Sequence, residues 1–170
     1  MNILTVNLLL STLVFWIGAR LYVLPRLPVL RPRTVLLPIL LLHSLRHLGL
    51  MFLASGATYP GMPLEFAQPA AWGDLLAAVL ALAAIPAVAT EARVGRLLVW
   101  LFNVEGTVDL LTATTLAAIY NAAPHMGAAY WLPAFWVPAL LVTHYVTFVV
   151  LCRHWDAARV NARAGGSDVV

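Results

Sequence analysis

Residues 41–50, LLHSLRHLGL, combine the leucine content of a membrane-spanning helix with three side chains that such helices rarely carry. His43, Arg46 and His47 follow the spacing i, i+3, i+4, which places residues on one face of an α-helix. An ionised side chain at the centre of a membrane helix costs about 2.5–3.5 kcal/mol on insertion scales, so it needs partners inside the protein. The stretch therefore predicts a membrane-spanning helix that forms one wall of a buried polar site.

The composition of the whole chain is typical of a polytopic membrane protein. Of its 170 residues, 62% are hydrophobic and 10% are charged, whereas soluble domains average about 45–50% and 25%. The mean hydropathy is +0.90. The formal net charge of +3 gives no sign of nucleic-acid binding, and the single cysteine, Cys152, cannot form an intrachain disulfide. The expected partner is therefore a lipid bilayer, with no nucleic acid.

Five apolar segments are long enough to cross a hydrocarbon core of about 30 Å. They cover residues 3–24, 34–55, 71–90, 97–120 and 131–152. No basic region precedes the first segment, so we expect it to be retained as a span and not cleaved as a signal peptide. The predicted fold is an all-α bundle of five transmembrane helices, with one domain over residues 1–155 and a short cytoplasmic tail over residues 156–170.

The arginines predict the orientation of these helices, because short cytoplasmic loops carry the excess of basic residues. The basic regions contain Arg20, Arg26, Arg31, Arg33, Arg93, Arg96, Arg153, Arg159 and Arg163. They fall around the first loop, in the third loop and in the tail, while the second and fourth loops contain none. We therefore expect an external N-terminus and a cytoplasmic C-terminus in a bacterial cytoplasmic membrane. Arg46 is the arginine that this rule does not explain.

Polar residues on three predicted helices lie at similar depths. The candidate site consists of His43, Arg46, His47, Asn103, Glu105, Asp109 and His144. Because a helix rises 1.5 Å per residue, Arg46 and Asp109 each lie about 20 Å from the cytoplasmic side and Glu105 about 13 Å. We therefore expect Arg46 to pair with Asp109, which leaves Glu105 as the carboxyl that gains and loses a proton.

Two further expectations concern the third and fourth helices. The fourth helix carries polar residues on two sides, which predicts a place in the middle of the bundle. Asp74 lies near the start of the predicted third span, where it is expected to reach water or to cap the helix. The proline-rich segment 56–69 before that span would cover a pocket at the external side.

The sequence leaves several functions open. Buried carboxylates and imidazoles at mid-depth favour a site that binds or transports a small polar molecule, an ion or a proton. The alternative is a metal or haem protein, either redox-active or lipid-modifying, with ligands among His43, His47, Glu105 and His144; the i, i+4 histidine pair can chelate one metal. A structural subunit with a buried polar network is a third interpretation. The sequence identifies no cofactor, and an oligomer is compatible with it.

Overall fold

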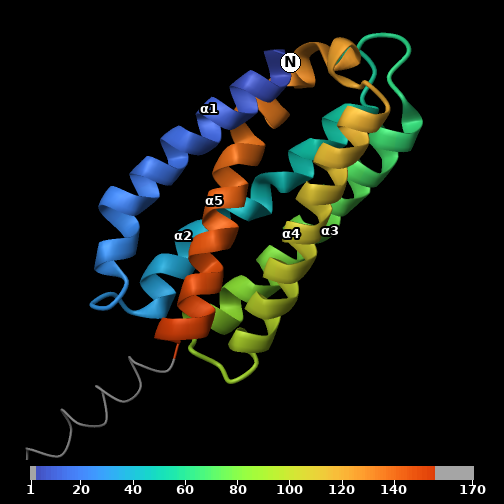
Figure 1. Ribbon diagram of the computed structural model, residues 1–170. Helices are drawn as coiled ribbons and strands as arrows, with labels where there is room; N and C mark the ends of the chain where they lie inside the picture. Colours follow the sequence, from blue (N-terminus) through green and yellow to red (C-terminus); the bar gives the residue numbers. More distant parts are fainter. Residues whose placement is uncertain (1–2, 156–170) are drawn as a thin grey trace, which may run out of the picture.

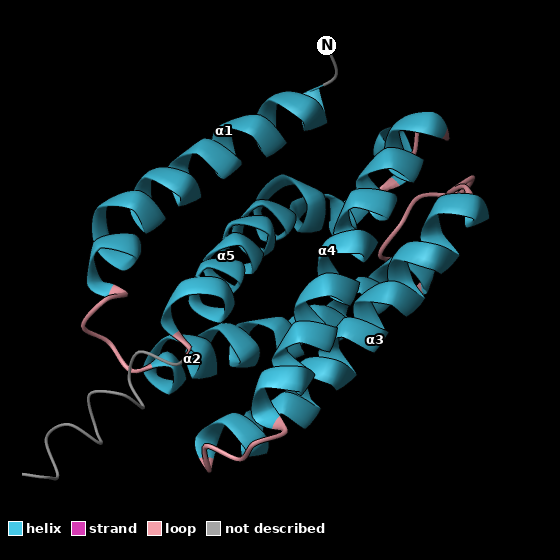
Figure 2. Cartoon of the chain, turned by 60° about the horizontal axis from the view of Figure 1, so that its bottom comes forward, coloured by secondary structure: helices cyan, strands magenta, loops and turns pink. Residues whose placement is uncertain are grey.

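The computed structural model describes residues 3–155, and this part of the chain is helical and contains no strand (Figure 1). The α-helices are α1 (Ile3–Gly18), α2 (Pro32–Ser44), α3 (Leu64–Ala89), α4 (Gly95–Ile119) and α5 (Val137–Val149). Shorter 3₁₀ and π segments extend or join them: η1 (Ala19–Val23), η2 (Leu24–Arg26), η3 (Leu45–Leu53), η4 (Ala123–His125), η5 (Gly127–Tyr130), η6 (Leu132–Trp136) and η7 (Val150–His154). Figure 2 shows that the loops lie at the ends of these helices.

Five continuous helical segments in the described part are long and apolar enough to span a membrane. They are Ile3–Arg26, Pro32–Leu53, Leu64–Ala89, Gly95–Ile119 and Gly127–His154. The prediction of an all-α chain with five such helices is therefore confirmed. The expected tail, residues 156–170, lies outside the described residues.

Helix α3 begins earlier than the sequence predicted. It starts at Leu64, directly after Pro63, and Pro69 lies inside the helix and not in the preceding loop. The predicted start at residue 71 is about two turns too late. Asp74 consequently lies about 15 Å along α3, well inside the helix and away from its capping positions.

Alanines allow α3 to pack closely against its neighbours. Buried alanines along this helix include Ala67, Ala71, Ala77, Ala81 and Ala84. Such small side chains let helix backbones approach one another, and α3 packs against α2, η3 and α4. This helix therefore forms the main contact surface for the segments that carry the polar residues.

Helix α4 lies at the side of the bundle, so the prediction of a central fourth helix is wrong. An apolar stripe on α4 is exposed, formed by Leu97, Leu101, Val104, Val108 and Leu111. The opposite side packs against α3 and α5 and contains the buried Asn103 and Gly106. α4 thus buries one side and exposes the other, so the helix is not surrounded by neighbours.

The stretch LLHSLRHLGL contains a change of helix type. α2 ends at Ser44, whose hydroxyl donates to the carbonyl oxygen of Leu40 over 2.8 Å, and the chain continues as the 3₁₀ segment η3. A 3₁₀-helix has three residues per turn, and the buried residues of η3 are Arg46, Gly49 and Phe52. The period of three therefore turns Arg46 into the bundle, towards α3.

Candidate functional site

The side chain of Arg46 is the centre of the polar cluster. It is 1% exposed and reaches three other helices. Its Nε donates to Asp74 Oδ1 on α3 over 2.7 Å, and its Nη2 donates to Asp109 Oδ2 on α4 over 2.5 Å. Its Nη1 lies 3.3 Å from both the carbonyl oxygen of Gly106 and the Nε2 atom of His144 on α5. One guanidinium thus joins η3 to α3, α4 and α5.

The hydrogen bonds around His144 assign its tautomer. Asn103 donates through Nδ2 to the backbone carbonyl of His144 over 3.3 Å, so its Oδ1 faces the ring. His144 Nδ1 lies 2.7 Å from that Oδ1 and must donate to it. Nε2 then carries the lone pair that accepts from Arg46. The arrangement therefore holds His144 as a neutral imidazole, with both ring nitrogens occupied.

Glycines provide the space that the cluster occupies. A Cβ added at Gly106 would lie 2.5 Å from Nη1 of Arg46 and 2.7 Å from Cε1 of His144. A Cβ at Gly49 would overlap the carboxyl of the aspartate on α3, and one at Gly73 would overlap the carboxyl of the aspartate on α4. η3, α3 and α4 therefore each have a glycine where a charged side chain of a neighbouring helix contacts them.

His43 is buried on the α5 side of the cluster. Its Nε2 lies 2.9 Å from the hydroxyl of Thr143, and that hydroxyl also lies within hydrogen-bond distance of two carbonyls of its own helix. The hydroxyl can donate its single hydrogen to a carbonyl and accept from Nε2 of His43. Nδ1 of His43 has no hydrogen-bond partner among the described residues. The ring packs edge-on against His144, with centroids 4.3 Å apart.

Glu105 lies one turn from Asp109 on α4 and does not bind Arg46 in the structure. Its Oε2 is buried and has no hydrogen-bond partner in the described part of the chain. The expected Arg46–Asp109 pair is present, and Glu105 is left over as expected. Asp74 is a second partner of Arg46 that the sequence interpretation missed, and its place well inside α3 shows that the expectation that it caps the helix is wrong.

His47 does not join the cluster. It is exposed, and its Nδ1 lies 2.9 Å from the carbonyl oxygen of Ser44 in the preceding turn. The reason is the change of helix type, because a 3₁₀ turn advances by about 120° per residue and an α turn by about 100°. Over the steps from His43 to His47, this difference rotates His47 about 60° away from the shared face.

The residues considered as metal ligands are not brought together. Among the described residues, no group of three or more His, Cys, Asp and Glu side chains could hold a metal ion. His43 and His47 face different directions, and both ring nitrogens of His144 are engaged. In this conformation the histidine pair therefore does not form a chelating site.

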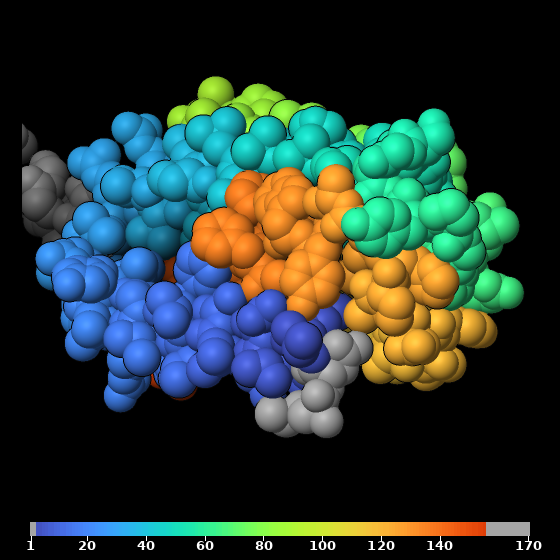
Figure 3. Space-filling view, turned by 90° about the horizontal axis from the view of Figure 1, so that it is seen from above, coloured from blue at the N-terminus to red at the C-terminus, as the bar shows by residue number. Residues whose placement is uncertain are grey.

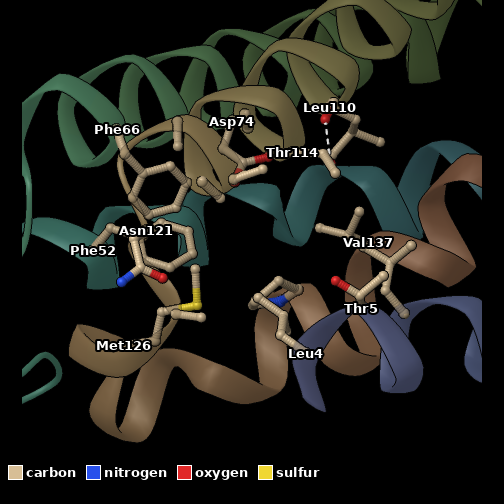
Figure 4. A pocket seen from close by; sticks show the side chains of 17 residues that line it. Leu4, Thr5, Phe52, Phe66, Asp74, Leu110, Thr114, Asn121, Met126 and Val137 are labelled. Atoms are coloured by element: carbon tan, nitrogen blue, oxygen red, sulfur yellow. Dashed lines mark hydrogen bonds between the residues drawn. The ribbon is translucent and has the colours of Figure 1, made fainter. Parts of the chain in front are cut away.

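A pocket of about 330 Å³ adjoins the cluster at the end of the bundle where α1 begins (Figure 4). α1, η3, α3, α4 and the start of α5 contribute to it, and most of its lining is apolar, including Phe52, Phe66, Leu110 and Met126. Among the described residues that line it, Asp74 is the only one with an ionisable side chain. The Asp74 carboxyl therefore both lines the pocket and binds the buried guanidinium of Arg46.

Two loops bonded to each other cover this end of the bundle. The amide of Tyr59 donates to the carbonyl of His125 over 2.8 Å, and the amide of Ala129 donates to the carbonyl of Ala57 over 3.1 Å. His125 Nδ1 lies 3.1 Å from the carbonyl oxygen of Pro60. Seen from this end, the chain around residues 127–136 packs between α1 and the loop near residue 60 (Figure 3). The loop before α3 thus packs against the segment between α4 and α5, and residues of that segment line the pocket.

Residues 3–155 are thus all-helical, with five helices long and apolar enough to span a membrane, which is compatible with an integral membrane protein. The chain belongs to the family described as "Domain of unknown function (DUF8737)", whose model matches residues 3–152. No curated protein and no solved structure matches it.

Proposed function

We propose that this protein is an integral protein of the bacterial cytoplasmic membrane that binds or transports a small molecule, held in the pocket beside Asp74. This proposal rests on the place of Asp74 between the pocket and the buried Arg46. Its carboxyl accepts a hydrogen bond from the buried Arg46 and also lines a pocket of about 330 Å³. That volume is at the lower end of the range for small-molecule sites, about 300–1,000 Å³. Mostly apolar walls with a small number of polar groups, here Asp74, Thr5, Thr114 and Asn121, are also typical of such sites.

The proposed orientation has α1 beginning outside and the C-terminal end in the cytoplasm. It is supported by the alternation of arginine-containing and arginine-free loops. In this orientation the pocket lies in the external half of the membrane. A cysteine placed within residues 27–32 tests the orientation, because labelling from the periplasmic side would contradict it.

Filling the pocket is expected to weaken ligand binding. Ala113 lines the pocket from α4, so Ala113→Leu places a larger side chain there. Binding of three probes, octylamine, octanol and octanoate, can be measured by equilibrium dialysis on the protein in zwitterionic lipid nanodiscs, with empty nanodiscs as the blank. We expect saturable binding of at least one probe, with one site per chain, and a loss of affinity of about tenfold or more in Ala113→Leu, equivalent to about 1.4 kcal/mol or more.

Ala83→Leu is the matched control. Ala83 is exposed on α3 and does not line the pocket, so the same change there should leave binding unaltered. If no probe binds saturably, or if both variants weaken binding equally, the proposal is overturned. The cluster then acts only to hold the helices together.

A further inference from the structure

The charged side chains beside the proposed pocket indicate the class of ligand that it binds. Arg46 contributes one positive charge, while its two partners, Asp74 and Asp109, are both carboxyls. The nearest imidazole, His144, is held neutral by Asn103 and Arg46. With both aspartates ionised, Arg46 and its two partners together carry one negative charge in excess, and no cationic residue lines the pocket among those described.

One oxygen of the Asp74 carboxyl makes no hydrogen bond within the described part of the chain. Oδ1 accepts from Nε of Arg46, whereas Oδ2 lies beside Gly49 of η3. The side chain is 16% exposed, and it points among the pocket residues in Figure 4. A cationic donor adds the attraction of opposite charges to the hydrogen bond that a neutral donor would also make to a carboxylate, so this oxygen favours a cationic group.

The apolar lining of the pocket indicates that the ligand also has an apolar part next to its cationic group. Phenylalanine, leucine, alanine, valine and methionine side chains make up most of the lining. A fully polar cation would lose its hydration there without replacement, which is costly. An alkyl chain would instead gain from leaving water or from contact with the walls.

The exposed part of the rim indicates how such a molecule would arrive. The linked loops cover the end of the bundle, whereas Thr5 of α1 and both Thr114 and Ala118 of α4 line the pocket and are exposed. α1 packs mainly on α5 and η6, and α4 packs mainly on α3 and α5. The opening thus lies at the side of the bundle between α1 and α4, where lipid would surround it in a membrane.

We infer that the pocket takes an amphiphile with a protonated amine, which enters from the bilayer between α1 and α4 and donates an N–H group to Asp74. This inference rests on the proposed function and names the class of ligand. A primary alkylammonium ion is the simplest member of that class.

The three octyl probes in nanodiscs test the inference, because they share a chain and differ in head group. We expect octylamine, protonated at neutral pH, to bind at least tenfold more tightly than octanol, and octanoate to bind most weakly. Asp74→Asn should lower the affinity for octylamine more than that for octanol, so that the difference between the two probes disappears. Because Asp74 also binds Arg46, this variant is first checked for folding; if it does not fold, the ranking of the three probes on the wild-type protein decides the matter.

The outcomes separate this inference from the proposed function. If octanol binds as tightly as octylamine and Ala113→Leu weakens the binding of both, the proposed pocket is supported and the inferred preference for a cation is wrong. Tightest binding of octanoate would also overturn the inference. If no probe binds saturably, both proposals fail.

Discussion

Arg46→Met is expected to destabilise the protein by about 3–5 kcal/mol, the usual cost of removing one partner from a buried ion pair. Methionine fills a similar volume and supplies none of the donors. Asp74 and Asp109 would be left as adjacent buried carboxyls without a counter-charge, and η3 would lose its polar links to α3, α4 and α5. Thermal or denaturant unfolding in detergent micelles measures the change.

Glu105→Gln is the matched control for this variant. It alters a carboxyl of the same cluster that makes no hydrogen bond to Arg46 in the structure and keeps nearly the same shape, so we expect a much smaller change in the free energy of unfolding than for Arg46→Met. If Arg46→Met unfolds like the parent while Glu105→Gln is strongly destabilised, the ion pairs have been assigned to the wrong carboxyl. If both unfold like the parent, the cluster is hydrated and contributes no net stability.

Gly106→Ala is expected to destabilise the bundle by about 1–3 kcal/mol, the range for overpacking a well-packed core. The new methyl group would lie 2.5 Å from Nη1 of Arg46 and 2.7 Å from Cε1 of His144, and both side chains are held by hydrogen bonds. The guanidinium would have to move away from the carbonyl of Gly106 and from at least one carboxylate. The same unfolding measurement reports this effect.

Gly18→Ala provides the comparison for Gly106→Ala. Gly18 is the last residue of α1, and a Cβ added there has nothing within 4 Å. Alanine is favoured over glycine inside a helix by about 0.5–1 kcal/mol, so this variant should be neutral or slightly more stable. Equal stabilities of the two variants would show that the cluster does not pack against α4 as the structure has it.

The sequence predicts the number and approximate limits of the helices because each apolar segment has to cover the same hydrophobic thickness. The predicted limits are wrong at the start of α3, because proline occurs both in loops and near the start of helices. Pro69 suggested a loop, although it lies near the start of α3, and this shift concealed Asp74. Counting depth from the true start at Leu64 would have placed Asp74 about 15 Å along the helix, close in depth to Arg46.

The site was predictable only as far as the helix geometry is regular. The pairing of Arg46 with Asp109 follows from depth alone, and so does the surplus of carboxyls. Depth does not predict that His47 lies outside the cluster, because its position depends on the change from α to 3₁₀ geometry after Ser44. The glycines gave a further signal: Gly49, Gly73 and Gly106 each lie three residues or fewer from an ionisable residue of the cluster.

Photoaffinity labelling with a decylamine that carries a diazirine on its chain tests most directly whether the pocket beside Asp74 binds a ligand. The protein in nanodiscs is irradiated with the probe, digested and mapped by mass spectrometry. We predict labels in the α3 and α4 segments that line the pocket, residues 66–74 and 110–118, suppressed by excess octylamine and by Ala113→Leu. Labels spread over the exposed apolar surface, for example at Leu82 and Leu97, and insensitive to both the competitor and the variant, would contradict the account.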